Sequence, residues 1–466
     1  MHTGSTPSGV WEVRRPGREW GTLGERAAYL CVVLDHMRTE ATSVSEILDE
    51  LQWRGAVAQT TDEAALREAL AAGPITLYCG FDPTAPSLHF GNFVQLVALR
   101  RFQRAGHKVI CLVGGSTGLI GDPKPTSERV LKTAEQTAAN VARIKSLVQP
   151  FLDFDGTSGV AHPAVMVDNL DWTAPMSALD FLRDVGKHFR VNQMVKKDAI
   201  AARLESQEGI SYTEFSYQLL QALDFLELYR SHGCTMQIGG SDQWGNLTAG
   251  VDLIHKVEGV DVHLMTSPLL TDASGVKFGK SEGNAIWLSA DMTSPYAFYQ
   301  YFLNIEDASV ITLLKVFSDR GQEEIAELER QVAEEPYRRA AQKALAGDMV
   351  TLVHGPEAYA AVQAASEALF GKGDLATLDE HTLRDAVAEL PSGQVSVGMP
   401  VVEALVAVGL VESRNAARRA IADGGASLNG QKVVDPEAVL RDQDFLHGSV
   451  TILRRGRKSM AAGLLS

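Results

Sequence analysis

Hydrophobic residues recur along most of the chain with helical spacing, and short apolar runs between them have the length of buried strands. Ile75 to Cys79 is one such run, and Lys108 to Val113 is another. Between them, Phe90 to Ala105 carries apolar residues on a helical period and ends at Gly106. Strand, helix and strand in this order predict parallel strands joined by a right-handed crossover. In such a sheet, ligands bind at the carboxyl ends of the strands.

Two helices are expected ahead of the first strand. Ser43 and Glu46 form a capping-box pattern before the first of them. Thr60 and Glu63 repeat that pattern before Ala64 to Ala72, so the second helix is expected to begin there.

The alternation of strands and helices continues and then gives way to helices alone. Thr213 to Arg230 is strongly helical, Thr235 to Ile238 is typical of a short strand, and Gln243 to Ile254 is typical of another helix. From Ser294 to about Leu390 the chain is rich in Ala, Glu and Arg and is expected to be helical throughout. Pro391-Ser392-Gly393 then has the composition of a linker.

The last segment combines helices with a hairpin signal. Val401 to Val408 has a helical pattern, and a basic helix is expected around Arg414 to Arg419. Asn429-Gly430, between Ala426 to Leu428 and Lys432 to Val434, is typical of a tight turn joining two strands.

The length of 466 residues exceeds what one hydrophobic core usually spans, so several domains are expected. The predicted fold is α/β, with a Rossmann-like parallel sheet first, a helical domain second and a small α+β module last. Four segments are distinguished: 1–42 as a poorly ordered N-terminal extension, 43–292 as the parallel-sheet domain, 293–390 as the helical domain and 396–466 as the C-terminal module.

Composition narrows the class of protein. With 45% hydrophobic and 22% charged residues, the chain has the make-up of an ordinary globular protein. No apolar run approaches the roughly 20 residues that cross a bilayer, so we expect a cytoplasmic protein without a membrane segment. Its four cysteines are far apart and form no CxxC pair, which predicts reduced thiols and no metal site: Cys31, Cys79, Cys111 and Cys234. The net charge of -15 disfavours general binding to polyanions.

The turn from Gly80 to Asn92 joins the first strand to the start of a helix. Backbone N–H groups at a helix start attract phosphate, and Gly91 lets a ligand approach the backbone. His89 and Asn92 add side-chain donors, so the segment suits a nucleotide. Taken alone, His89 is more often a capping or packing residue than a ligand.

A second candidate is Lys277-Phe278-Gly279-Lys280-Ser281, which follows a polar loop. Two ammonium groups and a hydroxyl on such a segment can neutralise a departing pyrophosphate. A Walker A loop is the alternative, but Gly275 to Ser281 is one residue too short for it and no strongly helical segment follows. The other alternative is a solvated turn with two lysines.

The third candidate is a polar stripe on the helix Thr213 to Arg230. Steps of four and three residues place Tyr217, Gln221 and Asp224 on one face. Such a stripe usually faces water unless another element covers it, and Gln237 to Gln243 is suitably placed to do so. Within that segment Asp242 could accept hydrogen bonds from ribose hydroxyls at a strand end.

In this order along the chain, the motifs resemble the bacterial tyrosyl-tRNA synthetases from about Leu48 to Leu440. The matching segments are YCGFDPTAPSLHFGN (78–92), VGGSTGLIGDP (113–123), FLRDVGKHF (181–189), TEFSYQLLQALDF (213–225), MQIGGSDQWGN (236–246, with Met236 in place of Leu) and KFGKS (277–281). The resemblance implies a class I catalytic domain with the HIGH signature at His89 to Asn92 and the KMSKS signature at Lys277 to Ser281. It also implies that the helical domain contacts the anticodon region and that the C-terminal module binds RNA.

Roles follow from the resemblance at individual positions. Tyrosine-binding residues would be Tyr78 and Asp224 at the phenol, Asp122, Tyr217 and Gln221 at the ammonium group, and Gln243 near the carboxylate. ATP-binding residues would be Cys79, Gly80, Asp82, Thr84, His89, Gly91, Gly240, Asp242 and Lys280. Catalytic residues would be His89, Asn92, Lys277, Lys280, Ser281 and Arg129. RNA-binding residues would be Arg414, Arg418, Arg419, Arg454 and Arg455, in a module that carries 9 basic and 7 acidic residues.

The resemblance implies a homodimer that binds tyrosine, ATP with Mg²⁺, and tRNA(Tyr), with no bound metal or organic cofactor. The sequence departs from the family at the second histidine of HIGH, which is Asn92 here, and in the loop after Pro123, where the role of Lys124 is open. The resemblance begins only after Met37, so residues 1–36 are expected to be an extension or to precede the true start.

Two alternatives remain at this point. One is an enzyme like tryptophanyl-tRNA synthetase. Tyr78 and the polar stripe disfavour it, because they suit a phenol better than an indole. The other is a non-catalytic RNA-binding protein with the same fold, which the presence of His89, Lys277 and Lys280 disfavours.

Overall fold

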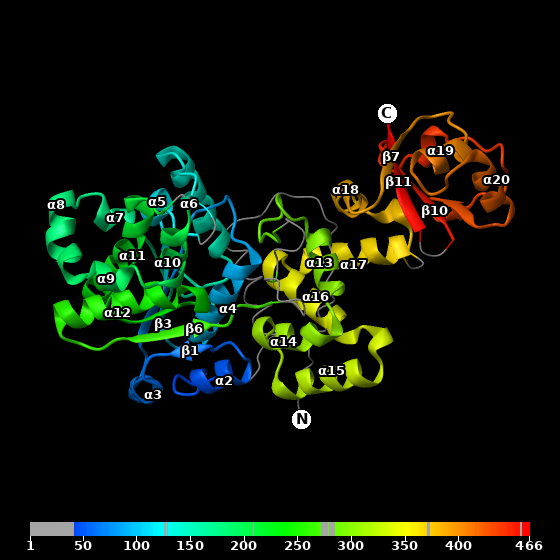
Figure 1. The fold of residues 1–466 in the computed structure, drawn as a ribbon. Helices are drawn as coiled ribbons and strands as arrows, with labels where there is room; N and C mark the ends of the chain where they lie inside the picture. Colours follow the sequence, from blue (N-terminus) through cyan, green and yellow to red (C-terminus); the bar gives the residue numbers. More distant parts are fainter. Residues whose placement is uncertain are drawn as a thin grey trace, which may run out of the picture.

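The structure is a computed structural model that describes residues 42–124, 127, 129–207, 209–271, 278, 285–370, 373–456 and 459–466. The predicted N-terminal extension, 1–42, lies outside the described residues except for Thr42. Three parts follow one another along the chain: a sheet covered by helices, a group of helices, and a small second sheet with its own helices (Figure 1).

The first sheet has six strands in the order β1-β6-β5-β2-β3-β4. These strands are β1 (Gln59–Thr60), β2 (Thr76–Phe81), β3 (Lys108–Val113), β4 (Val165–Asp168), β5 (Cys234–Gly240) and β6 (His263–Ser267). Strands β2 to β6 pair in parallel, as the sequence predicts for β2 and β3, and β1 pairs antiparallel with β6. The chain runs outward from β2 to β4 and returns to the other side of β2 at β5. The strand order therefore reverses between β2 and β5, where ligands bind in sheets of this kind.

Helices cover the sheet and connect its strands (Figure 1). They are α2 (Ile47–Trp53), α3 (Glu63–Ala72), α4 (Phe90–Arg104), α5 (Thr117–Ile120), α6 (Ala134–Val148), α7 (Leu170–Thr173), α8 (Ala178–Asp180), α9 (Val191–Met194), α10 (Asp198–Glu205), α11 (Tyr212–His232) and α12 (Trp244–Glu258). Shorter turns are η1 (Phe181–Val185), η2 (Gly186–His188) and η3 (Ser241–Gln243). The predicted helices before and after the site, α4 and α11, are confirmed.

One predicted cap is wrong. Helix α3 is capped by Asp62, whose carboxylate accepts a hydrogen bond from the Ala65 N–H at 3.1 Å. Thr60, the predicted cap, lies in β1 opposite Met265, so its backbone is extended and paired. The other capping box forms in part, because the Ser43 hydroxyl donates to the Glu46 carboxylate instead of accepting from the helix.

The middle part is helical, as predicted. Its helices are α13 (Pro295–Leu303), α14 (Asp307–Phe317), α15 (Gln322–Glu334), α16 (Ala340–His354), α17 (Pro356–Phe370) and α18 (Glu380–Ala388), with the turns η5 (Pro336–Arg338) and η6 (Leu375–Thr377). The end of α14 packs against the start of α4, where the Phe317 ring lies 4.5 Å from that of Phe90 and stacks on that of Phe93 at 5.5 Å. These buried rings join the middle part to the sheet domain.

The C-terminal part is a five-stranded sheet in the order β7-β11-β10-β8-β9 with two helices. Its elements are β7 (Ser392–Val395), α19 (Val401–Ala407), α20 (Arg414–Ala422), β8 (Ala426–Leu428), β9 (Gln431–Lys432), η7 (Asp442–Asp444), β10 (Val450–Arg455) and β11 (Ser459–Leu465). The predicted hairpin is confirmed, with positive φ angles of 46° at Asn429 and 81° at Gly430. The linker interpretation of Pro391-Ser392-Gly393 is wrong, because β7 pairs in parallel with β11 and belongs to this sheet.

Candidate active site

Asp82 lies directly after β2 at the reversal point of the sheet and is held by two hydroxyl groups. Thr117 Oγ1 donates to Asp82 Oδ1 at 2.6 Å, and the Tyr217 hydroxyl donates to Asp82 Oδ2 at 2.8 Å. A side chain at position 114 would collide with this group, since a Cβ there would lie 2.2 Å from Asp82 Oδ1. Gly114 therefore allows the turn after β3 to pack directly against Asp82.

Asp224, on α11, is the most deeply placed carboxyl group of the site. Its oxygens accept hydrogen bonds from Asn169 Nδ2 and from Trp172 Nε1, both at 3.0 Å. The same amide of Asn169 donates to Thr117 Oγ1 at 3.0 Å. A continuous chain of hydrogen bonds thus runs from Asp224 through Asn169 and Thr117 to Asp82. Sequence reasoning missed Asn169 and Trp172, although Asn169 directly follows a strand, β4, where site residues are expected.

Tyr78 and Gln221 bring further polar atoms to the same place. The Tyr78 side chain is buried in β2 with its ring 5.3 Å from that of Phe225. Burial first, and then the charge of Asp224, raise the pKa of Tyr78 well above its ordinary value. Among the described residues, neither the Tyr78 hydroxyl nor Gln221 Oε1 has a hydrogen-bond partner, and both atoms are buried. Such atoms suit a polar ligand that would pair with them.

Burial governs the ionisation of the carboxyl groups of the site. It raises the pKa of Asp224 to about 8, against hydrogen bonds from Asn169 and Trp172 that act in the opposite direction. It also raises the pKa of Asp82 and of Asp122, again as the largest cause. Carboxyl groups that are costly to ionise when alone would be stabilised in their charged form by a cationic ligand such as an ammonium group.

Asp122 is oriented by two amides from the start of α12 and the turn before it. Gln243 Nε2 donates to Asp122 Oδ2 and Asn246 Nδ2 donates to Asp122 Oδ1, each at 3.0 Å. Sequence reasoning named Gln243 but missed Asn246, whose side chain faces the site because it stands three residues after Gln243 near the helix start. Arg129 Nε donates to the Asp122 carbonyl oxygen at 2.7 Å.

A buried ion pair holds the polar loop that contains Arg129. Arg203 and Glu214 are almost fully buried, and Arg203 Nη1 donates to Glu214 Oε2 at 2.8 Å. Arg203 also donates to the Lys124 carbonyl oxygen, and Glu214 accepts from the Arg129 backbone N–H at 2.9 Å. The pair ties both sides of the loop to α11. Lys124 is therefore held through its backbone carbonyl oxygen. This contact assigns no role to the Lys124 side chain.

His89 caps the start of α4 with an extended backbone, and Asn92 begins the first turn. A Cβ at position 91 would lie 2.9 Å from His89 Cε1, so Gly91 is needed for the present position of the imidazole ring. The strand-like segment around Trp287 pairs with His89, and the Phe90 N–H donates to the Ile286 carbonyl oxygen at 2.9 Å. The chain that follows the KFGKS segment is thereby attached to the HIGH segment.

The remaining predicted ATP residues line the ends of β2 and β5. Gly80 lies near the end of β2, and Asp82 and Thr84 follow that strand. Gly240 ends β5 and Asp242 lies in η3. Cys79 is buried in β2, and burial raises the pKa of its thiol to about 12. Only Phe278 of the KFGKS segment is described, with its N–H donating to the Leu270 carbonyl oxygen at 2.9 Å. The predicted residues Lys277, Lys280 and Ser281 lie outside the described residues.

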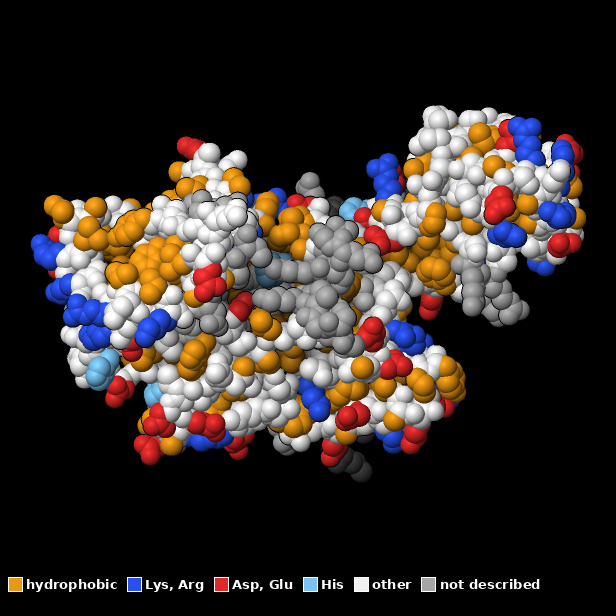
Figure 2. Space-filling model, viewed as in Figure 1, with side chains coloured by type: hydrophobic (Ala, Val, Ile, Leu, Met, Phe, Trp, Pro, Cys, Tyr) orange, Lys and Arg blue, Asp and Glu red, His pale blue; other side chains and the backbone are white. Residues whose placement is uncertain are grey.

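The five predicted RNA-binding arginines fall into two groups. Arg414, Arg418 and Arg419 are exposed on α20, where Arg414 pairs with Glu403 at 2.9 Å. Figure 2 shows Lys and Arg side chains at this end of the C-terminal part, with acidic side chains between them. Arg454 and Arg455 instead donate to the carbonyl oxygens of Leu369 and Leu410, respectively. Arg454 therefore holds the C-terminal part against the end of α17.

The described part of the chain lacks a metal-binding cluster and a membrane-spanning helix. It contains no group of three or more His, Cys, Asp or Glu residues that could hold a metal ion. None of its helices is long and apolar enough to cross a membrane.

The parallel sheet, with its site at the reversal of strand order and the HIGH segment at the start of α4, has the architecture of a class I aminoacyl-tRNA synthetase. Residues 70–371 match the family model described as tRNA synthetases class I (W and Y). Residues 382–461 match the model of the tyrosine–tRNA ligase SYY-like C-terminal domain.

Curated relatives define the specificity. The chain is 58% identical over 420 residues to the tyrosine–tRNA ligase of Streptomyces coelicolor, a match that covers 90% of this chain and 99% of the relative. It is 57% identical over 420 residues to the tyrosine–tRNA ligase of Leifsonia xyli, covering 90% of this chain and 94% of the relative. The chain therefore belongs to the tyrosine–tRNA ligase family of enzymes. The family resemblance and the parallel-sheet fold expected from the sequence are confirmed.

A solved structure agrees with this assignment. The C-terminally truncated mitochondrial tyrosyl-tRNA synthetase of Aspergillus nidulans superimposes with a TM-score of 0.63 at 29% sequence identity. The match covers 74% of this chain and 99% of that one.

Proposed function

We propose that the chain activates tyrosine with ATP to give tyrosyl adenylate and pyrophosphate, and then transfers the tyrosyl group to tRNA(Tyr). The observation that supports this most is the buried chain of hydrogen bonds from Asp224 through Asn169 and Thr117 to Asp82. It connects the predicted phenol-binding residue with a predicted ATP-binding residue and fixes both in advance.

In the proposed complex, the tyrosine phenol lies between Tyr78 and Asp224. Its ammonium group lies near Asp122, Tyr217 and Gln221, and its carboxylate points toward Gln243. The raised pKa values of the site carboxyls support this arrangement, because an ammonium group would stabilise their charged forms. The buried and unpaired atoms of Tyr78 and Gln221 would gain partners from the same ligand.

The activation step needs positioning and charge stabilisation, with no covalent enzyme intermediate. An oxygen of the tyrosine carboxylate attacks the α-phosphorus of ATP, and the bond from that phosphorus to pyrophosphate breaks. His89 and Asn92, at the N-terminal end of α4, would contact the phosphates, and Lys277, Lys280 and Ser281 would close over pyrophosphate. Arg129 would contact the phosphates together with these three residues. Mg²⁺ would arrive with ATP as counter-charge on the phosphates.

Tyrosine-dependent exchange of pyrophosphate into ATP, followed by charging of a tRNA(Tyr) transcript, tests the proposal. We expect both reactions with tyrosine and neither with tryptophan at comparable concentrations. An absence of exchange, or a preference for tryptophan, would overturn it.

We also propose a division of labour along the chain. Residues 43–292 would carry the chemistry, 293–390 would contact the anticodon region of tRNA, and the C-terminal part would bind RNA through exposed Arg414, Arg418 and Arg419. The exposed position of these side chains on one helix supports that role. Arg454 and Arg455 would contribute by fixing the position of the C-terminal part.

We further propose a cytoplasmic homodimer that assembles through the segment around η1. Large apolar side chains are exposed on this segment, with exposed fractions of 78% for Leu179, 49% for Leu182 and 63% for Val191. Figure 2 shows hydrophobic side chains gathered over this end of the sheet domain. Burial against a second copy would remove them from water. Sedimentation of the wild type as a dimer and of Leu179→Asp/Leu182→Asp as a monomer is expected, and a monomeric wild type would contradict the proposal.

A further inference from the structure

Four arginine side chains meet at the junction of the sheet domain and the helical part. Arg54 comes from the end of α2, and Arg100, Arg101 and Arg104 come from the last turns of α4. Among the described residues, the carboxylates that form ion pairs with them are those of Glu50 and Asp319. Arg54, Arg100 and Arg101 are buried, so this excess of positive charge requires other partners.

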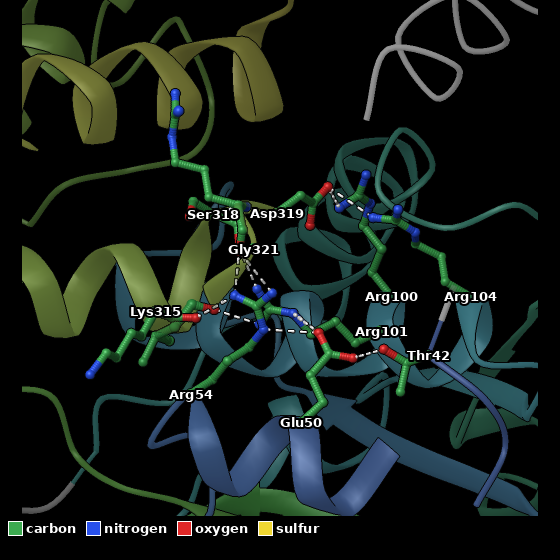
Figure 3. A network of polar contacts seen from close by, with 12 residues as sticks. Thr42, Glu50, Arg54, Arg100, Arg101, Arg104, Lys315, Ser318, Asp319 and Gly321 are labelled. Atoms are coloured by element: carbon green, nitrogen blue, oxygen red, sulfur yellow. Dashed lines mark hydrogen bonds and ion pairs between the residues drawn. The ribbon is translucent and has the colours of Figure 1, made fainter. Parts of the chain in front are cut away.

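Those partners are backbone carbonyl oxygens at the end of α14. Arg54 donates to the carbonyl oxygens of Lys315 at 2.9 Å, Ser318 at 3.0 Å and Arg320 at 3.2 Å. Arg101 donates to those of Val316 at 2.5 Å and Ser318 at 2.8 Å. The last carbonyls of a helix lack partners within the helix and carry partial negative charge. The two arginines therefore cap α14 from another domain, as Figure 3 shows.

Asp319, directly beyond α14, completes the contact. Its carboxylate accepts from Arg100 at 2.7 Å and from Arg104 at 2.9 Å (Figure 3). Burial alone would raise the pKa of Asp319, but the charges of Arg100 and Arg104 outweigh it and hold that pKa well below its ordinary value. Burial and the neighbouring Arg54 lower the pKa of Arg101 to about 9, so it remains charged at neutral pH. The group is thus a charged network across two domains.

Helix α4 connects this network with the active site. The helix has 15 residues and is about 22 Å long, with His89 at its N-terminal end and Arg104 at its C-terminal end. Near the first of these ends, Phe317 of α14 packs on Phe90 and Phe93. The helical part is thereby attached to both ends of the helix that carries the HIGH segment. Contacts at these two separate places fix the orientation of the helical part relative to α4.

We propose that Arg54, Arg100, Arg101, Arg104 and Asp319 form an interdomain clamp that positions tRNA for the transfer step. These are positioning residues that touch neither tyrosine nor ATP. The clamp fixes the helical part relative to α4, so that a tRNA held by the helical and C-terminal parts presents its acceptor end to the adenylate. The proposal rests on the two-step function proposed above. Adenylate formation needs only the sheet domain and does not depend on the clamp.

The test uses Asp319→Asn in the full chain, which keeps the shape of the side chain and removes its charge. We expect pyrophosphate exchange within about twofold of wild type, because the tyrosine and ATP residues are untouched. The kcat of charging should fall roughly 10- to 100-fold, because a displacement of about 1 Å can have that effect. The KM for tRNA should change by less than about twofold, since its binding surfaces remain. A loss of folding alone would reduce both reactions together.

Asp348→Asn is the matched control, because it breaks the Arg320–Asp348 pair at 2.7 Å inside the helical part. It should leave the ratio of charging to exchange unchanged. Arg104→Met and Arg104→Lys supply a second pair of variants at a side chain that is 28% exposed, so both should fold even if Asp319→Asn does not. Only the methionine variant should lose charging, since lysine retains the charge beside Asp319.

The outcomes separate the clamp from the proposed function. Equal losses of exchange and charging in Arg104→Met, or unchanged charging in both Arg104→Met and a folded Asp319→Asn, would overturn the clamp alone. A wild-type chain without tyrosine-dependent exchange would overturn the proposed function, and the clamp with it.

Discussion

Asn169 donates a hydrogen bond to Asp224 across 55 residues of sequence, with 3.0 Å between Nδ2 and Oδ2. Its side-chain oxygen Oδ1 accepts a hydrogen bond from the Ser116 N–H at 2.7 Å, so the side-chain amide is fixed at both ends. One side chain therefore orients the carboxyl group at the phenol end of the site and the turn after β3 together.

Replacing Asn169 by Ala should leave both the Asp224 carboxyl group and the turn after β3 less firmly held. The Ser116 N–H would lose its acceptor, and Trp172 would be the one donor left to Asp224 among the described residues. Leaving such buried groups unpaired lowers the free energy of unfolding by about 1–3 kcal/mol. The KM for tyrosine should rise, because Asp224 is no longer held in place. Urea unfolding and pyrophosphate exchange measure the two effects, and an unchanged KM would show that Asp224 needs no such support.

Local patterns were sufficient to predict the strands β2, β3 and β5 and the helices α4 and α11. Their apolar periodicity is continuous, and the residues that define it are neighbours in sequence. The polar stripe of Tyr217, Gln221 and Asp224 could be predicted for the same reason. Its burial depends on covering elements, and the structure shows Tyr217 bonded to Asp82, which is 135 residues away.

The partners of that stripe could not be predicted, because strand order brings them together. Asn169 and Trp172 follow β4, an edge strand that is only partly buried and has a weak periodic signal. The burial of the arginines of α4 could not be predicted either, because in the sequence of the helix they are typical of a charged surface. Their burial arises from α14, more than 200 residues further along the chain. The strand β7 was missed because its Gly and Ser have low strand propensity and its pairing with β11 is non-local.

Asp224 should also make stability depend on pH. Burial raises its pKa from 3.8 to about 8, so between these values the folded state keeps a proton that the unfolded state has lost. The stability of the protein without ligand therefore falls as pH rises through this window. The side chain of Asp224→Asn has no such proton to lose. As pH rises, the free energy of unfolding of the variant should therefore increase relative to that of wild type, by at most about 1.4 kcal/mol per pH unit. The free energies of unfolding of both proteins in urea are to be compared between about pH 5.5 and about pH 8, within this window. A difference between them that does not change with pH would contradict the raised pKa of Asp224.

Asp224→Ala should lose discrimination against phenylalanine. In the wild type, phenylalanine would leave the buried Asp224 acceptor without the phenol that pairs with it. Such an unpaired group is worth about 1–3 kcal/mol, or roughly 5- to 150-fold in specificity. The ratio of kcat/KM for tyrosine and phenylalanine in exchange measures it. Retained rejection of phenylalanine would mean that Asp224 does not contact the phenol.

Lys280→Ala should slow activation and leave tyrosine binding nearly unchanged. This lysine lies outside the described residues, and its proposed role follows from the KFGKS signature. A cation that meets charge developing only as pyrophosphate leaves contributes to the transition state and not to the ground state. Loss of one such group lowers the rate roughly 10²- to 10³-fold. Pre-steady-state adenylate formation and equilibrium tyrosine binding separate the two effects, and an unaltered rate would remove Lys280 from the mechanism.

Ending the chain at Leu390 should preserve pyrophosphate exchange and severely weaken tRNA charging. The cut removes the complete C-terminal sheet, including β7, together with the exposed arginines of α20. The removed part has its own core, which includes Val401, Leu405 and Ile421. It touches the helical part through His447 and Arg454, which bond to the carbonyl oxygens of Leu378 and Leu369, far from the tyrosine and ATP residues.

Because Val450, Ile452 and Met460 of the removed sheet also pack on the core of the helical part, the shortened chain exposes apolar surface. Its melting temperature is therefore the control, to be measured beside both reactions. We expect exchange to stay within about twofold of wild type while charging falls, and the fall should deepen as salt weakens the remaining phosphate contacts. Full charging by the shortened chain at physiological salt would show that tRNA does not need the C-terminal part.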